Sequence, residues 1–412
     1  MKIAYFAEIF PSISETWVHH EISQLIDMGC DVRVFATHAR PTTIAPELSK
    51  FVALTTYLPE VEKSLVDVLR VFCSPAIRKN VLAGIITDCP QNRQKLQVLR
   101  DIAIAGLFSR HLAAYRPEFI LAHFGGTRAN LALIWSMVSG TRFGIKFHAS
   151  DVFARVALLR LKVKQAAKLM TISKFNLSFM CEHYPDIDFA SCSVHKCGIP
   201  VDEYPFQPKS MPCDSLVIMS TGRLVPMKGF PVLLRASRRL LEKGLSHKVK
   251  IYGDGPDRKR LGQLIEAMGL EANVEIMGHY DPNGIRTALL DADMFVLPAV
   301  FDRVERTMDG IPVSLIEAMS VGTPVISTTI SGIPELIEHG VNGYLAVPGD
   351  PESLAEAVLR WHCLNEVDRN QMLVAARTKI ELDHDVQKLS SVLKRDLLGC
   401  LRIAGSGKGC AE

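Results

Sequence analysis

A run of apolar and small residues holds the most informative chemistry of this chain. Glu317 is the only charged residue in 311–326, and a lone carboxylate in such a run is costly unless polar groups meet it. Asp309 lies eight positions earlier, where Gly310 and Pro312 mark a loop that enters a helix. The pattern brings two carboxylates and the free N–H groups of a helix start together. Acceptors for hydroxyls beside donors for phosphates are what a sugar nucleotide requires.

Two cations follow the end of a predicted strand in the second half of the chain. Gly222-Arg223 comes directly after Leu216–Thr221, and Lys228 lies five positions after Arg223. Arginine grips two phosphate oxygens in a fork, and lysine adds a point charge. A strand end followed by a glycine and two cations therefore predicts an anion pocket at the carboxyl edge of a parallel sheet. Two solvated surface cations are the alternative reading of these positions taken alone.

Glycines end two further predicted strands. Gly253 follows Lys248–Tyr252, and Gly278-His279 follows Val274–Met277. Because glycine lets a ligand approach the main chain closely, we expect Gly253 to line the site. We expect Gly278 and His279 to border a nucleotide base through backbone groups. A plain connector explains Gly253 equally well.

The triplet Asp291-Ala292-Asp293 has the spacing of acid pairs that hold a metal with a sugar nucleotide. It lies at the end of a predicted helix, and Asp293 begins the strand Met294–Leu297. A hard divalent cation needs more converging oxygen ligands than this triplet supplies. The sequence therefore favours a structural role for the triplet, and we expect neither a metal nor a cofactor.

Short β-rich runs alternate with longer helical ones, which predicts an α/β fold of parallel sheets covered by helices. Each half has its own set of strands and is expected to form its own Rossmann-like, doubly wound sheet. Prolines punctuate the polar stretch 204–215, so we place the first domain at 1–204 and the second at 205–385, with a last helix at about 386–401 crossing back to the first domain. Beyond those named above, the predicted strands are Lys2–Ala7, Asp31–Ala36, Phe119–Ala122, Arg142–Phe147, Leu169–Ile172, Val194–Cys197, Pro324–Ser327 and Gly343–Ala346.

The bulk composition is that of a soluble globular protein. The chain has 412 residues, which favours two domains, and its net charge of +3 is too small to argue for nucleic-acid binding. No spanning helix and no signal peptide is expected, since the first apolar run is short and Glu8 interrupts it. The ten cysteines include no Cys-x-x-Cys pair, which indicates free thiols in a reducing cytoplasm.

Taken together and in order, several blocks of the second half give a specific resemblance. They are Gly222-Arg223-Leu224 with Lys228-Gly229, Gly253-Asp254-Gly255-Pro256, Asp293–Pro298, 309–326, Ser331–Glu335 and Gly340–Tyr344. The chain resembles the GT-B-fold retaining glycosyltransferases that carry an E-x7-E signature, in which two domains face each other across a cleft. The resemblance implies a donor diphosphate bound by Arg223 and Lys228 and by the backbone of Val313, Ser314 and Leu315.

The same resemblance assigns the two carboxylates. It implies that Glu317 binds the ribose hydroxyls and that the carboxylate at 309 lies near the transferred sugar. This chain departs from the signature there, because its first acid is Asp309, one methylene shorter than glutamate.

In the first half, the resemblance points to two loops after predicted strands. His148 and Asp151 match the family's His-x-x-Asp segment, which implies that His148 contacts the donor sugar. The turn with Ser14, Glu15 and Thr16 is similar to that of colanic-acid and exopolysaccharide transferases, and it implies a place over the reaction centre. Ser12 and Glu15 also fit the spacing of a capping box, so helix capping is an equal reading of that turn.

The sequence thus predicts a retaining glycosyltransferase that moves a sugar from a nucleotide-diphospho-sugar to a glycan or lipid-linked acceptor in cell-surface polysaccharide biosynthesis. A sugar-nucleotide epimerase of the same shape is one alternative. An inactive two-lobed nucleotide-sugar-binding protein is the other, which the departure at Asp309 makes conceivable. Basic and apolar helices in 60–115 and 155–168 suggest peripheral contact with the inner face of a membrane, although an ordinary packed amphipathic helix fits as well.

Overall fold

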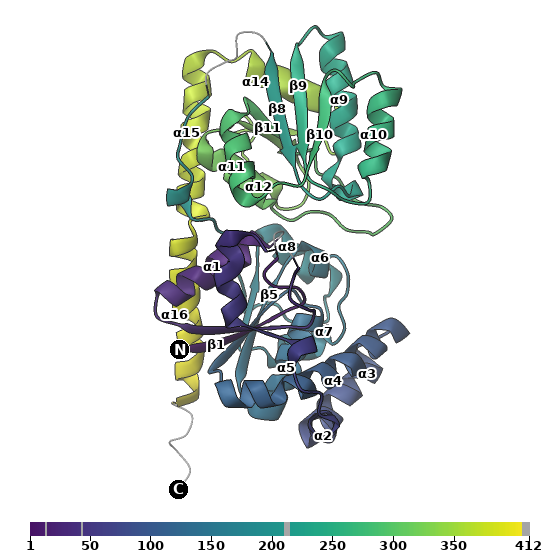
Figure 1. Cartoon of the computed structure of the whole chain (residues 1–412), viewed down its shortest axis with the longest axis vertical. Helices are drawn as coiled ribbons and strands as arrows, with labels where there is room; N and C mark the ends of the chain where they lie inside the picture. The colour runs from purple at the N-terminus through teal and green to yellow at the C-terminus, as the bar shows by residue number, and fades with distance from the viewer. Residues whose placement is uncertain (13–14, 43, 210–214, 406–412) are drawn as a thin grey trace. The chain divides into compact units, whose positions relative to one another are not determined.

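The chain folds into two α/β units. The structure is a computed structural model that describes residues 1–12, 15–42, 44–209 and 215–405 (Figure 1). One unit comprises Met1–Lys196 with the chain from Gln387 onward, and the other is Cys197–Val386. The second unit begins earlier than the sequence placed it, because Ile199, Val201 and Tyr204 are buried in its core.

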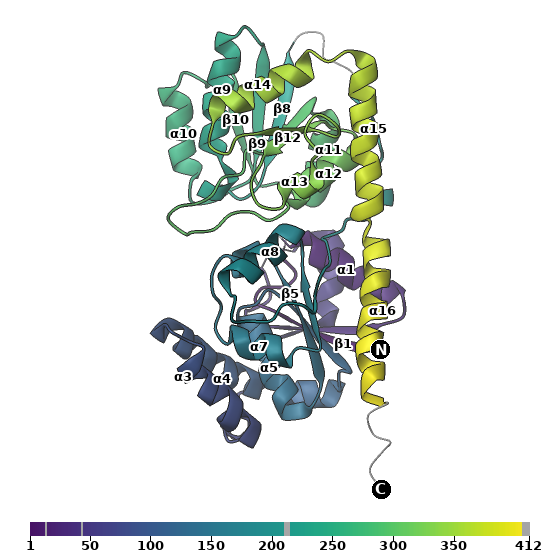
Figure 2. The same ribbon diagram turned by 180° about the vertical axis from the view of Figure 1, so that it is seen from behind.

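The first unit is built on a parallel sheet of seven strands in the order β3-β2-β1-β4-β5-β6-β7. Helices cover both faces (Figures 1 and 2). One face packs against α4, α5 and α7, and the other against α1, η1 and α16. The strands are β1 (Lys2–Ala7), β2 (Asp31–Ala36), β3 (Thr55–Tyr57), β4 (Phe119–His123), β5 (Arg142–Phe147), β6 (Lys168–Thr171) and β7 (Cys192–Val194).

The helices of this unit include a helical segment between β3 and β4 and a return from the far end of the chain. Leu393 and Leu397 of the last helix are buried beside β1. The helices are α1 (Thr16–Asp27), η1 (Pro46–Leu54), η2 (Leu58–Glu60), α2 (Leu65–Phe72), η3 (Ile77–Leu82), α3 (Ala83–Thr87), α4 (Asn92–Tyr115), α5 (Thr127–Ser139), α6 (Ala149–Val152), α7 (Leu159–Gln165), α8 (Lys174–His183) and α16 (Val386–Gly405).

The second unit has a parallel sheet of six strands in the order β10-β9-β8-β11-β12-β13. One face packs against α9, α10 and α14, and the other against α11, α12 and α13. The strands are β8 (Leu216–Thr221), β9 (His247–Tyr252), β10 (Val274–Gly278), β11 (Met294–Val296), β12 (Val325–Thr328) and β13 (Tyr344–Ala346). The helices are η4 (Val201–Glu203), η5 (Pro226–Lys228), α9 (Phe230–Glu242), α10 (Arg258–Ala267), α11 (Pro282–Asp291), α12 (Val313–Val321), α13 (Ile333–Leu336), α14 (Pro351–His362) and α15 (Glu366–Asp383).

These two sheets confirm the predicted fold class. In each sheet the chain adds strands first on one side of the unit's first strand and then on the other side. As a result β1 lies between β2 and β4, and β8 lies between β9 and β11. Such a reversal leaves a crevice at the carboxyl ends of the two central strands, which is where open α/β sheets bind ligands.

Candidate functional site

The switch point of the second sheet brings two sequence-predicted residues together. Lys228 follows β8 and Asp309 follows β11, and the Lys228 Nζ lies 2.9 Å from the Asp309 Oδ2. The side chains are 14% and 15% exposed. The contact is Coulombic, since the buried Oδ2 accepts no hydrogen bond from any residue that the structure describes. Apart from this contact with Lys228, the acceptor has no partner among the described residues.

Glycines keep the adjoining sheet edge free of side chains. Gly222 packs on the Lys228 side chain, where a Cβ would lie 3.1 Å from the lysine Cε. Gly253 has φ +144°, and a Cβ there would lie 2.0 Å from the Gly222 carbonyl oxygen. Its N–H donates to the Gly278 carbonyl at 2.7 Å. Backbone contacts thus join the ends of β8, β9 and β10. These backbones lie so close together that a residue larger than glycine does not fit at position 253.

The start of α12 supplies backbone donors. Pro312 precedes the helix and provides no side-chain cap. The Leu315 N–H already donates to the Pro312 carbonyl at 3.1 Å, so this member of the predicted phosphate cradle is occupied. Val313 and Ser314 are partly exposed and precede the first intrahelical bonds, and their N–H groups therefore provide the positive end of the helix.

Glu317 lies one turn further along α12 and is held by an aromatic residue. The Tyr204 hydroxyl donates to its Oε1 at 3.0 Å, and the Arg286 guanidinium lies over the Tyr204 ring, 4.6 Å from the centroid. Burial raises the pKa of Glu317 to about 7, against the opposing effects of the Tyr204 hydrogen bond and the Arg286 charge. The carboxyl thus sits close to its titration point near neutral pH.

The remaining predicted residues of this unit lie on the sheet edge or within the framework. Arg223 and His279 are exposed, after β8 and β10. The Asp293 carboxylate accepts the Val217 N–H at 2.8 Å and so ties β11 to β8, which agrees with the structural role favoured for the Asp-x-Asp triplet.

In the first unit, an ion pair again spans the switch point. Glu15, at the start of α1, receives a two-pronged contact from Arg128 of α5, at 2.7 and 2.9 Å. The Arg128 guanidinium also lies over the Phe124 ring, 4.7 Å from the centroid. Because α1 begins at Thr16 with Glu15 at its N-cap position, Ser12 and Glu15 are not the N-cap and N3 residues of a capping box, and that reading was wrong. Thr16 is the first residue of that helix, and Ser14 lies outside the described residues.

His148 begins α6 and is enclosed rather than open. Asp151 accepts the His148 backbone N–H at 2.9 Å and the Gly125 N–H at 2.6 Å, which fixes the turn after β5. The His148 ring stacks on Phe124 at 4.4 Å between centroids and contacts His123, with Nε2 3.0 Å from Nδ1. Burial, with the neighbouring His123 and Lys146 disfavouring an added positive charge, lowers the pKa of His148 well below its ordinary value. In this conformation the residue is 4% exposed, so the ring has little surface for the sugar contact that the resemblance implied.

Comparison with known proteins decides the class. Residues 205–378 match the family model described as glycosyl transferases group 1. The chain is 29% identical to the putative colanic acid biosynthesis glycosyltransferase WcaL of Escherichia coli K12, covering 98% of this chain and all of that one. It is also 29% identical to the amylovoran biosynthesis glycosyltransferase AmsK of Erwinia amylovora, covering 96% and 100%. Among solved structures, Anabaena Alr3699/HepE in complex with UDP and glucose superposes with a TM-score of 0.68 over 97% of this chain and 100% of that chain, at 17% identity. The chain is a glycosyltransferase of the GT-B fold, with a group 1 domain at 205–378.

Sequence reasoning missed three residues that complete the sites of this glycosyltransferase. Tyr204 and Arg286 hold Glu317, and Glu21 lies behind His148, linked to it by His123. Tyr204 lies in the stretch interpreted as a linker, and Arg286 is one of many helical cations. His123 follows β4 in the same way that His148 follows β5, and on this ground the sequence had offered 123–127 as a lining of the site, with a plain turn as the alternative.

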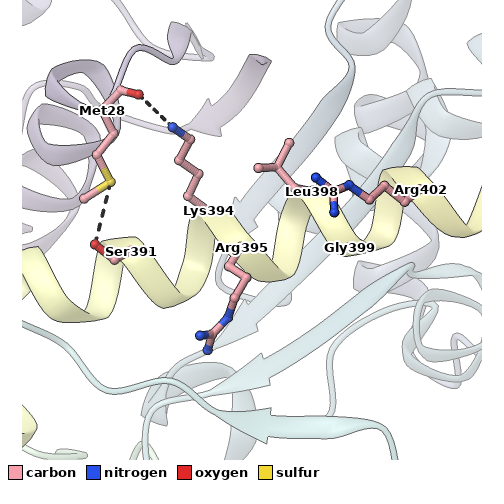
Figure 3. A pocket seen from close by; sticks show the side chains of 7 residues that line it. All are labelled: Met28, Ser391, Lys394, Arg395, Leu398, Gly399 and Arg402. Atoms are coloured by element: carbon pink, nitrogen blue, oxygen red, sulfur yellow. Dashed lines mark hydrogen bonds between the residues drawn. The ribbon is translucent and has the colours of Figure 1, made fainter.

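A pocket of about 460 Å³ in the glycosyltransferase lies away from these residues, along α16. Figure 3 shows Lys394 reaching back to Met28, whose carbonyl accepts its Nζ at 2.7 Å. Arg395, Leu398 and Arg402 also line it. Of the described helices, none has the length and apolar character to cross a bilayer.

Proposed function

We propose that this glycosyltransferase works with retention of configuration, taking its sugar from a nucleotide-diphospho-sugar and giving it to a glycan or lipid-linked acceptor during cell-surface polysaccharide biosynthesis. The observation that carries the proposal is the pair of Lys228 and Asp309 at the switch point. A cation for a leaving phosphate and a carboxylate for a sugar hydroxyl meet there, as a sugar nucleotide needs.

In this proposal Arg223, Lys228 and the N–H groups of Val313 and Ser314 bind the diphosphate, and Glu317 binds the ribose. These groups stabilise the negative charge that grows on the leaving diphosphate as the sugar–phosphate bond breaks. Asp309 then accepts a hydrogen bond from the transferred sugar.

Retention by front-face attack fits this arrangement better than a covalent intermediate. A carboxylate paired with an ammonium is a poor nucleophile, and Asp309 is so paired. The departing phosphate takes the acceptor's proton as the new glycosidic bond forms on the face that the phosphate leaves. Glu15, Thr16 and His148 are proposed to serve the acceptor and the transferred sugar from the first unit.

The names of similar proteins support the substrate class. WcaL and AmsK are named for the biosynthesis of colanic acid and amylovoran, and structures of HepE contain UDP, glucose or UDP-glucose. A UDP-sugar is therefore the first donor to test. We propose that no metal is needed, because Lys228 and Arg223 supply positive charge for the diphosphate while Asp293 is engaged by the Val217 N–H.

We also propose that the enzyme works in the cytoplasm, against the inner face of a membrane. The run 155–164 is not the contact surface: Arg155 pairs with Asp88, and Lys162 is fully buried. The helical segment 63–100 fits better, because its only acids, Asp67 and Asp88, are buried and paired with arginines. Its exposed apolar residues are Leu65, Val66, Leu69, Ile86, Leu96 and Leu99, and its exposed cations are Lys63, Arg70, Arg78, Lys79, Arg93 and Arg100. Cations beside apolar side chains suit an anionic bilayer.

A vesicle-flotation assay tests the membrane contact. The wild type is expected to float with vesicles that contain anionic lipid and to stay in solution with neutral ones. Replacing Leu65, Leu69 and Leu96 by serine should abolish flotation, whereas serine at the exposed Val304 and Val367 of the other unit should not. Flotation of the triple variant equal to that of the wild type would remove this surface from the proposal.

The donor proposal is tested by thermal shift with UDP-, GDP- and ADP-sugars, because a bound ligand raises the melting temperature with its occupancy. Incubating the stabilising donor without acceptor separates the alternatives. An epimerase releases epimerised sugar, and an inactive binding protein leaves the donor unchanged even when acceptors are present. Lys228→Ala should cut transfer by about 10²–10³-fold, as for loss of one charge-stabilising donor. Unchanged transfer would refute the assignment of the site.

A further inference from the structure

Three buried side chains form a hydrogen-bonded line that ends at the proposed active-site histidine. Glu21 comes from α1, His123 from the end of β4, and His148 from the turn after β5. The Glu21 Oε1 lies 2.8 Å from the His123 Nε2, and the His123 Nδ1 lies 3.0 Å from the His148 Nε2. All three are less than 5% exposed: Glu21 4%, His123 1% and His148 4%. Their proton positions are therefore set by one another and not by solvent.

The Glu21 end of the line fixes the protons. The Glu21 carboxylate, paired with Lys146, can only accept, so the His123 Nε2 that faces it carries a proton and donates. A neutral imidazole with its proton on Nε2 accepts at Nδ1. The His148 Nε2 that faces this Nδ1 therefore carries a proton and donates to it.

The charges around the line suit neutral imidazoles. Glu21 also accepts the Tyr5 hydroxyl at 2.9 Å and the Lys146 Nζ at 3.2 Å. Burial alone would raise the pKa of Glu21, but Lys146 and His123 outweigh it and hold that pKa well below its usual value. Lys146 therefore balances the carboxylate, and a proton added to either imidazole would face the lysine charge. Arg128 also disfavours a positive charge on His148.

We infer that Glu21 and His123 are positioning residues that hold His148 as a neutral imidazole protonated on Nε2. They lock the ring and, through it, the backbone turn from His148 to Asp151. We expect this backbone turn to keep its conformation when a charged donor binds elsewhere in the site. The expected effect on kcat rests on the proposed function, whereas the proton positions follow from the hydrogen bonds alone.

The experiment compares two variants that both remove the buried charges and differ in one acceptor. Glu21→Gln with Lys146→Met keeps an oxygen for the His123 N–H, whereas Glu21→Leu with Lys146→Met removes it. Long-range proton–nitrogen correlation spectra of histidine-labelled protein read the protonated nitrogen of each ring, and His123→Asn and His148→Asn assign the signals.

In the wild type and the Gln/Met variant, both rings are expected to carry the proton on Nε2, and His148 is expected not to titrate over the range around pH 6.5 in which a free imidazole does. In the Leu/Met variant His123 should lose that state. The kcat of the Leu/Met variant for transfer should fall at least tenfold, with its donor KM within threefold of the wild-type value. The Gln/Met variant should keep both kcat and donor KM within threefold of the wild type.

A proton on Nδ1 of His123 or His148 in the wild type, or titration of His148 in that range, would overturn the inference. So would unchanged spectra and kcat in the Leu/Met variant. If a variant does not fold, the wild-type spectra decide alone. If no donor supports transfer, the proposed function fails while the spectra still test the line.

Discussion

The Lys228 Nζ and the Asp309 Oδ2 lie 2.9 Å apart although they follow different strands, β8 and β11. The doubly wound topology causes this, because the two strands are neighbours with their windings directed apart. In the absence of donor the two charges offset each other. Under the proposed function, we expect a diphosphate that binds Lys228 to compete for its charge and to release Asp309 toward the sugar.

This competition gives opposite expectations for two substitutions of one residue. Asp309→Asn removes the negative charge, so the donor KM should stay or fall while kcat drops at least tenfold. Asp309→Glu restores the signature residue and should keep kcat within about fivefold, a span of roughly 1 kcal/mol. Initial rates against donor concentration measure both. Equal kcat for the asparagine variant and the wild type would show that the carboxylate does not touch the reacting sugar.

Glu317 provides a pH test in which stability and binding move apart. Its folded-state pKa is raised to about 7 by burial, from an ordinary value of 4.5. The folded state thus holds a proton that the unfolded state has lost, and stability falls as pH rises from about 4.5 to 7. Glu317→Gln removes this cost, so its melting temperature should exceed that of the wild type at pH 8 and converge with it toward pH 5.

The same substitution should weaken donor binding, because the ribose hydroxyls lose an anionic acceptor. Wild-type donor affinity should rise with pH through about 7 as Glu317 ionises, and that rise should be absent from the Gln variant. Tyr204→Phe is the matched control: it removes the hydroxyl that favours the ionised form and should move the midpoint to higher pH. A pH-independent wild-type affinity would separate Glu317 from the donor.

Gly253 tests the backbone contacts of the sheet edge. A Cβ would lie 2.0 Å from the Gly222 carbonyl oxygen, and φ is +144°, so Gly253→Ala must push the ends of β8 and β9 apart. We expect loss of donor-induced thermal stabilisation and a lower melting temperature. Gly262→Ala in α10, where a Cβ meets nothing within 4 Å, should instead stabilise by roughly 0.5–1 kcal/mol, since alanine favours helix. A Gly253→Ala variant that binds donor as the wild type does would contradict the close approach.

The sequence was informative where one residue pattern decides the structure. Strands such as β1, β5 and β8 match the predicted ranges, because each is a short apolar run bounded by turn residues. The strand Thr55–Tyr57 was missed, because three residues are too few to show the alternation of apolar and polar residues that marks a strand. The predicted strand at Val194–Cys197 lies two residues earlier, at Cys192–Val194, where it pairs with β6.

The partners of the site residues could not be predicted in the same way. Nothing near Glu317 in the sequence points to Tyr204, because their contact arises from η4 packing beside α12. The line from Glu21 to His148 likewise needs three separate elements to converge. Sequence spacing predicts which residue leaves a strand end, whereas contacts across elements depend on how the helices pack on the sheet.

The return of α16 to the first unit gives a prediction about stability alone. Leu397 is fully buried beside β1, and the Lys168 Nζ on β6 lies 2.6 Å from Asp396. Leu397→Ala removes buried methyl groups and leaves a cavity, so the unit should lose about 2–5 kcal/mol. Amide hydrogen exchange should quicken in α16 and β1 and remain unchanged in β8 and β9. Val392→Ala, which is 38% exposed on the same helix, is the control and should change stability by less than about 0.5 kcal/mol. Equal exchange in the two variants would mean that α16 does not contribute to the core of the first unit.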